Sequence, residues 1–233
     1  MVETKKSRFG RALAAAFPHT VPVLTGFLVL GMAYGVLMGT KGYGVFWAVL
    51  MSAVAFCGSM QFAAITLLTS AFNPMAALLL SLMVNARHLF YGLSMLEKYR
   101  GLGKARGILI YTLCDETFSI SAGVKPPPEV ERRYFYLSIS LLDYLYWVLG
   151  TLLGGIVGGL ITFNTTGLDF VLTALFVVLF LEQLKKADNR LSGLIGVAAS
   201  AVMLLCFGAE NMVIPSMLLI LVILLLGRKK LCA

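Results

Sequence analysis

Apolar stretches separated by short polar segments follow one another along almost the whole chain. Several reach the roughly 18 to 20 residues that a helix rising about 1.5 Å per residue needs to cross a hydrocarbon core. These stretches cover residues 21–39, 74–96, 134–160, 168–184, 191–207 and 212–227. The pattern predicts an all-α fold, a polytopic transmembrane helical bundle. We expect a single transmembrane domain, residues 19–230, preceded by a cytoplasmic amphipathic lead-in, residues 1–18.

Composition supports a membrane protein and excludes several other classes. Hydrophobic residues make up 59% of the chain, charged residues 13%, and the mean hydropathy is +0.90, well above a soluble domain. The net charge of +8 comes from short clusters between apolar runs, which is typical of cytoplasmic loops rather than of nucleic-acid binding. The four cysteines form no CxxC pair and there are only two histidines. Neither a disulfide framework nor a metal site is supported, and we expect no cofactor.

The positions of the lysines and arginines predict the topology. Placing every cluster in the cytoplasm follows the positive-inside rule and requires an even number of crossings between successive clusters. Three apolar stretches, 21–39, 44–69 and 74–96, lie between the first basic cluster and the one at 98–106. Because three is odd, we expect the middle stretch to be a discontinuous, re-entrant helix that breaks near 57–60 and returns to the side it entered.

The same count predicts a second discontinuous helix within residues 108–124, broken near 114–120, because both of its flanks are basic. Irregular backbone at membrane depth is tolerated where it faces protein or a water-filled cavity. Paired breaks of this kind form the binding sites of many transporters. The alternative is that both segments cross fully and the basic loop at 98–106 departs from the statistical rule.

Polar residues interrupt the apolar run in "SLMVNARHLFYGLS", residues 81–94. At 100° per residue they occupy one half of a helix, opposite a half rich in leucine. The members of the polar half are Ser81, Asn85, Arg87, His88, Tyr91 and Ser94. A charged arginine near the bilayer centre costs at least about 2.5 kcal/mol unless it is paired, snorkels to an interface or faces a cavity. Arg87 is too deep to snorkel comfortably, so we expect this half to face the protein interior and to serve function.

A second polar group lies in "YTLCDETFSIS", where Thr112, Asp115, Glu116 and Ser119 fall within about 100° of arc if the segment is helical. Two adjacent carboxylates need a cation or a proton. Arg87 is the candidate counter-ion, and a remaining carboxylate could carry a proton. The alternative is that Asp115 or Glu116 caps the break and pairs with Arg106. Asp143 is a third buried acid, with no partner visible in the sequence.

Glycines repeat at small-xxx-small spacing in two of the predicted spans. Gly31 and Gly35 form one such pair, and Gly154 with Gly158 and Gly155 with Gly159 form two more. This spacing lets helix backbones approach closely, so it predicts a tightly packed bundle. The chain carries no GxSxG, HExxH, Walker or dinucleotide-binding motif. What remains favours a secondary transporter driven by an ion gradient over an enzyme.

Three motifs in order, "FCGSMQFAA", "NARHLFYGLSM" and "CDETFSI", resemble the AzlC-type large subunit of bacterial branched-chain amino acid exporters, and the resemblance covers most of the chain. It implies proton-driven export of leucine, isoleucine, valine and, in some members, methionine across the bacterial inner membrane. It also implies a small AzlD-type membrane protein as obligate partner. Both termini of this chain are expected in the cytoplasm. Carried over by position, the motif residues are Gly58, Ser59, Gln61, Phe62, Asn85, Arg87, His88, Tyr91, Asp115, Glu116 and Phe118.

A zwitterionic amino acid needs a donor, an acceptor and an apolar pocket. We expect Arg87 and the amides near Gly58 and Ser59 to hold its carboxylate, and Asp115 or Glu116 to hold its ammonium. The substrate-binding candidates are Gly58, Ser59, Gln61, Phe62, Asn85, Arg87, Tyr91 and Phe118. The proton-coupling candidates are His88, Asp115, Glu116 and Asp143. Two other classes stay open: a non-transporting assembly or scaffold subunit, and an intramembrane enzyme with the same polar residues as an acid/base cluster.

Overall fold

A computed structural model describes residues 5–69, 71, 73–160, 170, 174, 177, 180, 181, 184, 185 and 187–231. Its regular elements within these residues are helices, which confirms the all-α prediction. The chain divides into two compact units, residues 1–168 and 169–233. Three described helices are long and apolar enough to cross a membrane: Ser7–Thr40, Arg132–Leu160 and Arg190–Gly208. They coincide with the predicted spans at 21–39, 134–160 and 191–207.

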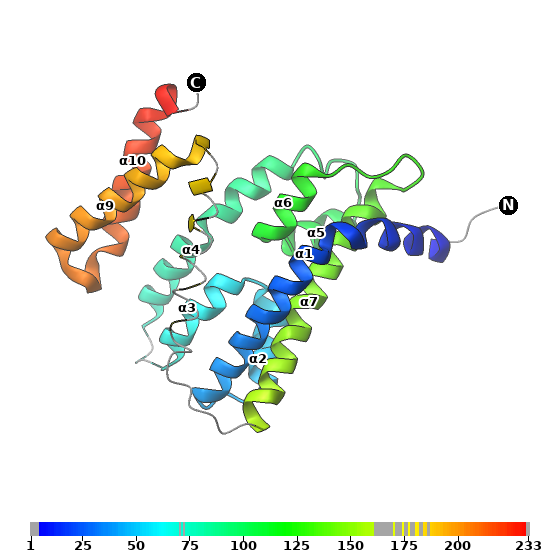
Figure 1. Cartoon of the computed structure of the whole chain (residues 1–233), viewed down its shortest axis with the longest axis horizontal. Helices are drawn as coiled ribbons and strands as arrows, with labels where there is room; N and C mark the ends of the chain where they lie inside the picture. The colour runs from blue at the N-terminus through cyan, green and yellow to red at the C-terminus, as the bar shows by residue number, and fades with distance from the viewer. Residues whose placement is uncertain are drawn as a thin grey trace. The chain divides into compact units, whose positions relative to one another are not determined.

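The first unit is built on two long helices, α1 (Lys5–Thr40) and α7 (Arg132–Leu160), which lie side by side (Figure 1). Helix α1 joins the predicted lead-in and the first predicted span without interruption. The elements between them are α2 (Val45–Ala55), α3 (Gly58–Thr69), α4 (Pro74–Met95), α5 (Ala105–Tyr111) and α6 (Asp115–Gly123). Helix α4 corresponds to the predicted span at 74–96.

The second unit contains α9 (Ala187–Asn211) and α10 (Val213–Leu231), which pack against each other. Gly208 interrupts the helical geometry near the end of α9, with φ 71° and ψ 171°. That region of φ is open to glycine at little cost. The predicted span at 212–227 lies within α10, whereas the predicted span at 168–184 lies largely outside the described residues.

Glycines allow α1 and α7 to touch backbone to backbone, as the small-xxx-small spacing predicts. A Cβ atom added at Gly31 would lie 3.0 Å from the backbone nitrogen of Thr151, and one added at Gly150 would lie 2.7 Å from the carbonyl oxygen of Phe27. One added at Gly154 would overlap the backbone of Met32. The two helices therefore hold a separation that no larger residue at these positions permits.

Helices α2 and α3 form the first interrupted segment, and the predicted break near 57–60 is confirmed. The interruption lies at Phe56 and Cys57, where Phe56 takes a left-handed backbone conformation with φ 39°. Gly58 already opens α3. The hydroxyl of Tyr43, just before α2, donates to the carbonyl oxygen of Leu68, near the end of α3, at 2.8 Å. The two half-helices thus fold back into a hairpin whose ends lie together.

Helices α5 and α6 form the second hairpin. The interruption covers residues 112–114, at the leading edge of the predicted interval 114–120, and Asp115 begins α6. Thr112 follows the last residue of α5, so it does not share a helix face with Asp115. The predicted arc of four polar residues is therefore wrong for Thr112. The amine of Lys98, after α4, donates to the carbonyl oxygen of Ala122 at 2.9 Å. The second hairpin therefore returns to the end of α4 from which the chain left.

The two hairpins begin at opposite ends of α4 and meet at their breaks. The hydroxyl of Tyr111, at the end of α5, donates to the carbonyl oxygens of Ala53 and Val54, at the end of α2; the bond to Ala53 measures 3.0 Å. Both α3 and α6 start at this meeting point and run away from each other. The two hairpins thus approach this meeting point from opposite ends of α4, which is the geometry of paired discontinuous helices.

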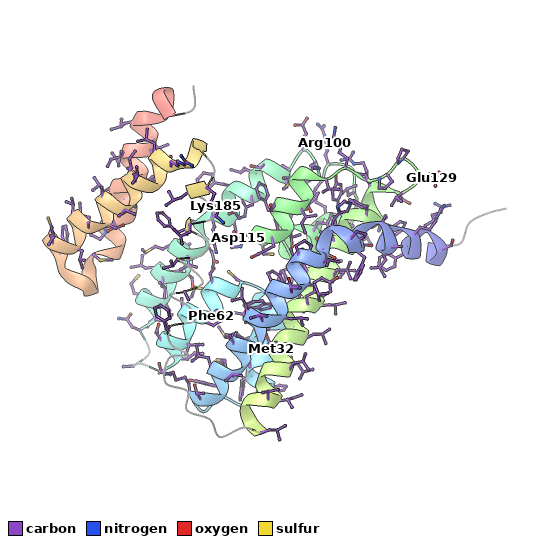
Figure 2. The ribbon with its side chains drawn as sticks, viewed as in Figure 1. Met32, Phe62, Arg100, Asp115, Glu129 and Lys185 are labelled. Atoms are coloured by element: carbon purple, nitrogen blue, oxygen red, sulfur yellow. The ribbon has the colours of Figure 1, made fainter. Side chains whose placement is uncertain are left out.

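Basic clusters gather at one end of the first unit. Arg8 lies 4.0 Å from Glu131 in an ion pair, and Arg132 donates to the carbonyl oxygen of Lys98 at 2.5 Å. Figure 2 shows Arg100 and Glu129 at this end, with Met32 and Phe62 toward the other. Burial lowers the pKa of the Lys98 amine, and the neighbouring charges of Lys125 and Arg132 lower it further. Three clusters at one end match the even number of crossings that the charge pattern predicts.

Candidate functional site

The polar and apolar halves of helix α4 lie in different environments, as predicted. Leu82, Leu89 and Phe90 are 59%, 71% and 63% exposed, whereas the polar residues from Asn85 to Tyr91 are partly buried. The apolar half is thus available to lipid and the polar half faces the rest of the unit. Ser94 is the exception: it is exposed and donates to the carbonyl oxygen of Phe90 at 2.9 Å.

Arg87 joins α4 to the starts of α3 and α6, the inner half-helices of the two hairpins. Its Nη2 lies 3.0 Å from Asp115 Oδ2 and donates to Ser59 Oγ at 2.6 Å. Asp115 is the first residue of α6 and Ser59 the second of α3. The ion pair predicted between Arg87 and Asp115 is therefore present. The alternative partner, Arg106, instead lines a shallow pocket with Glu97 at the basic end.

Unused polar atoms remain around this ion pair. Within the described part of the chain, Arg87 Nε and Asp115 Oδ1 are buried without a hydrogen-bond partner. The first amides of α3 and α6 also lie here, and the amino end of a helix carries a partial positive charge. Glu116 places a second carboxylate in the first turn of α6. The site thus offers a donor, an acceptor and two helix dipoles to a small zwitterion.

Gln61 and Phe62, which the sequence predicts in substrate binding, pack against α1, α2 and α7. The amide of Gln61 donates to Ser52 Oγ at 2.8 Å and accepts from the indole N–H of Trp147 at 2.8 Å. Phe62 is 2% exposed and meets the ring of Tyr34 edge to face at 5.5 Å. Both residues hold the first hairpin to the long helices.

Gly58 is required by the same packing, because an added Cβ would lie 2.9 Å from the ring of Trp147. Tyr91 and Phe118, the other aromatic candidates, stack on each other with ring centroids 4.4 Å apart, joining α4 to α6. His88 lies edge to face with Tyr91 at 5.8 Å. These contacts place Tyr91 and His88 beside the ion pair of Arg87 on the same helix.

Asp143 of α7 has a partner that the sequence did not reveal. The hydroxyl of Thr117 in α6 donates to Asp143 Oδ2 at 2.7 Å, and Cys114 lies 3.2 Å from the same hydroxyl. Asp143 is fully buried, and among the described residues its Oδ1 has no partner. The only sequence signal was a threonine directly after the acid pair Asp115-Glu116, and nothing in the sequence shows that this helix faces α7. The contact makes Asp143 part of the second hairpin's support.

A cavity of about 240 Å³ lies where the two helix breaks face α4. Its lining includes Asn85, whose Oδ1 accepts a hydrogen bond from the Cys57 thiol at 2.8 Å, and His88, whose Nδ1 is buried without a described partner. The remaining lining residues are Ala55, Phe56, Gly92, Ile110, Tyr111 and Leu113. Sequence reasoning missed these residues because four of them are apolar and neither Gly92 nor Tyr111 carries a charge. Within the described residues no three His, Cys, Asp or Glu side chains converge as metal ligands would.

Comparison with known proteins gives one family. A family model described as AzlC protein matches residues 22–161. The branched-chain amino acid transport protein AzlC of Bacillus subtilis (strain 168) is 49% identical over 227 residues, covering 97% of this chain and 89% of that protein. A membrane protein of Haemophilus influenzae is 41% identical over 94% of this chain and 91% of its own length. Inner membrane protein YgaZ of Escherichia coli (strain K12) is 24% identical over 73% of this chain and 72% of its own length. No solved structure matches.

Proposed function

Because the chain belongs to the AzlC family, we propose that it is the transporting subunit of an exporter for branched-chain amino acids. Its substrates are leucine, isoleucine and valine, with methionine as a further candidate, and its location is the bacterial inner membrane with both termini in the cytoplasm. A small AzlD-type membrane protein completes the transporter. The name of the Bacillus subtilis relative, a branched-chain amino acid transport protein, and the three motifs support the substrate class.

One observation carries the proposal: Arg87 bridges the starts of two inner half-helices at the meeting point of two hairpins. Its guanidinium and the helix amides suit a carboxylate, while Asp115 Oδ1 suits an ammonium. Hairpins that enter from opposite sides of a transporter expose a shared site to each side in turn. A substrate that binds here contacts the groups that hold the two hairpins together.

Proton coupling is assigned to the acids and the histidine of this region: His88, Asp115, Glu116 and Asp143. Asp143 is the first candidate for a test, because it is fully buried and its Oδ1 has no partner among the described residues, and buried intramembrane carboxylates often act in proton relays. Asp143→Asn keeps an oxygen for the hydroxyl of Thr117 but removes the titratable group. We expect this variant to exchange labelled leucine between the two sides while losing acceleration of efflux by a pH gradient. Efflux that still follows the gradient would remove Asp143 from coupling.

The first test is efflux of preloaded radiolabelled leucine, isoleucine, valine and methionine from cells carrying the chain with its small partner. Wild type is compared with Arg87→Ala, and with Arg100→Ala as a matched control at the exposed basic end, all at equal membrane levels. We expect faster efflux with wild type and Arg100→Ala and none above background with Arg87→Ala. If wild type moves none of the four amino acids, the assignment falls, and an assembly role becomes the better account of the polar core.

A further inference from the structure

The polar half of α4 is divided into two stripes with different surroundings. At 100° per residue, Asn85, His88 and Gly92 lie within about 60° of one another, and Arg87 and Tyr91 lie within about 40° on the adjacent face. The second stripe makes the ion pair with Asp115 and the stack with Phe118. The first stripe lines the cavity of about 240 Å³. The charged group and the cavity are thus neighbours around one helix.

The two features also lie at the same height along α4. Residues rise about 1.5 Å each in a helix, so Arg87 sits between Asn85 and His88 along the axis. The wall opposite α4 comes from the two helix breaks, with Phe56 from the first and Leu113 from the second. Both of these side chains are buried, at 5% and 6% exposure. The far wall therefore includes apolar side chains together with Cys57 and Tyr111, and the cavity lies on the face of α4 adjacent to Arg87.

From this arrangement we propose that the cavity receives the aliphatic side chain of the transported amino acid, and that Gly92 sets the length of side chain it accepts. This inference rests on the proposed function. The volume is several times the roughly 30 Å³ share of one water and below the roughly 300–1,000 Å³ of pockets for drug-sized ligands. It suits a small solute whose charged end stays at Arg87 and Asp115 while its apolar end packs between Phe56 and Leu113.

Gly92 is the lining position at which the cavity can be filled without disturbing the fold. A Cβ added there meets no atom within 4 Å, and alanine or leucine favours a helix more than glycine does. Larger side chains at Gly92 therefore fill the cavity without colliding with neighbouring protein atoms. Gly26 in α1 is the matched control, because it is also a helical glycine with nothing within 4 Å of an added Cβ and does not line the cavity.

The test measures efflux of valine, leucine and methionine separately for wild type, Gly92→Ala, Gly92→Leu and Gly26→Leu. One methylene in an apolar pocket changes discrimination by about tenfold or more. We expect Gly92→Leu to lower the leucine-to-valine and methionine-to-valine rate ratios at least about tenfold, Gly92→Ala to lower them less, and Gly26→Leu to leave them unchanged. Equal loss for all three amino acids, or unchanged ratios with Gly92→Leu, would overturn the inference.

A binding readout separates this inference from the proposed function. Cys57 lines the cavity, so in a chain whose other three cysteines are replaced by alanine its reaction with a small methanethiosulfonate reports access. We expect leucine to slow the reaction in wild type, and Gly92→Leu to abolish that protection while Gly26→Leu retains it. Protection without efflux would keep the cavity as an amino acid site and remove export. Efflux without protection would remove the cavity and keep export.

Discussion

Removing Arg87 and Asp115 singly and together separates what their ion pair does for the fold from what it does for transport. Arg87→Ala leaves the carboxylate of Asp115 partly buried without its cation, and Asp115→Ala leaves the guanidinium without its anion. Each single change breaks the pair and strands a charge. The double change removes both charges and strands neither, so it recovers part of the lost stability.

The size of this recovery follows from the distance and the exposure of the pair. Two unit charges 3.0 Å apart attract by about 5.5 kcal/mol at an effective dielectric constant of about 20. The side chains are 34% and 28% exposed, so water offsets much of this attraction. Exposed pairs couple by about 0.2–1 kcal/mol, and breaking a fully buried pair costs about 3–5 kcal/mol. We expect a coupling energy of about 2 kcal/mol, or about 4–8 °C in melting temperature for a chain of this size.

The assay compares the melting temperatures of wild type, both single variants and the double variant in one detergent, followed by leucine efflux for each. We expect the double variant to melt well above the temperature that the two single losses would give if they simply added. It should nevertheless transport no leucine, because the donor and acceptor for the substrate are both gone. Strict additivity of the two losses would refute the coupling, and transport by the double variant would refute the assigned role.

Three further predictions concern packing, topology and the basic end. Gly154→Ala should lower stability by about 1–3 kcal/mol through overpacking against α1, whereas Gly159→Ala, which meets nothing within 4 Å, should not; thermal melts check this. Single cysteines replace Lys41 and Asn73, which flank the first hairpin, and Lys104 and Glu129, which flank the second. An impermeant maleimide should label the first pair from one side of the membrane and the second pair from the other. Labelling of the Lys41 and Asn73 positions from opposite sides would contradict the hairpin fold. Lys98→Met should lower the free energy of unfolding by about 1 kcal/mol, because it removes the amine that donates to the carbonyl oxygens at the end of α6. The variant should therefore melt at a lower temperature than Lys104→Met on the same loop.

Much of the scaffold follows from the sequence because its signals are long or repeated. The length of the apolar stretches predicts the described spans. The even number of crossings required between basic clusters predicts the two breaks. The glycine spacing predicts the close contact of α1 with α7. The ion pair of Arg87 with Asp115 follows because a charge at membrane depth must find a partner and few are present. The family predicted from three motifs is confirmed by the comparisons.

The contents of the site were harder to predict because they depend on which helix faces which. Thr117 meets Asp143 only through the packing of α6 on α7, across 26 residues of sequence. Gln61 is polar in an apolar helix, which indicates function, yet its amide bonds to Ser52 and Trp147. Thr112 does not join the expected polar arc because α5 ends at Tyr111 and the interruption begins at Thr112. In each case a tertiary contact, rather than a local preference, decides where the polar atom points.

The glycine contact between α1 and α7 also determines which parts of the first unit are free to move. Where backbone touches backbone, as at Gly31, Gly150 and Gly154, there are no side chains whose rotation could absorb a displacement, so sliding one helix along the other would collide main chain with main chain. Helix α4 is attached differently, through an ion pair, a ring stack and a thiol hydrogen bond, all of which can re-form after a small shift. The long pair is therefore the part of the first unit that resists displacement, and we expect any shift within this unit to begin at the contacts of α4.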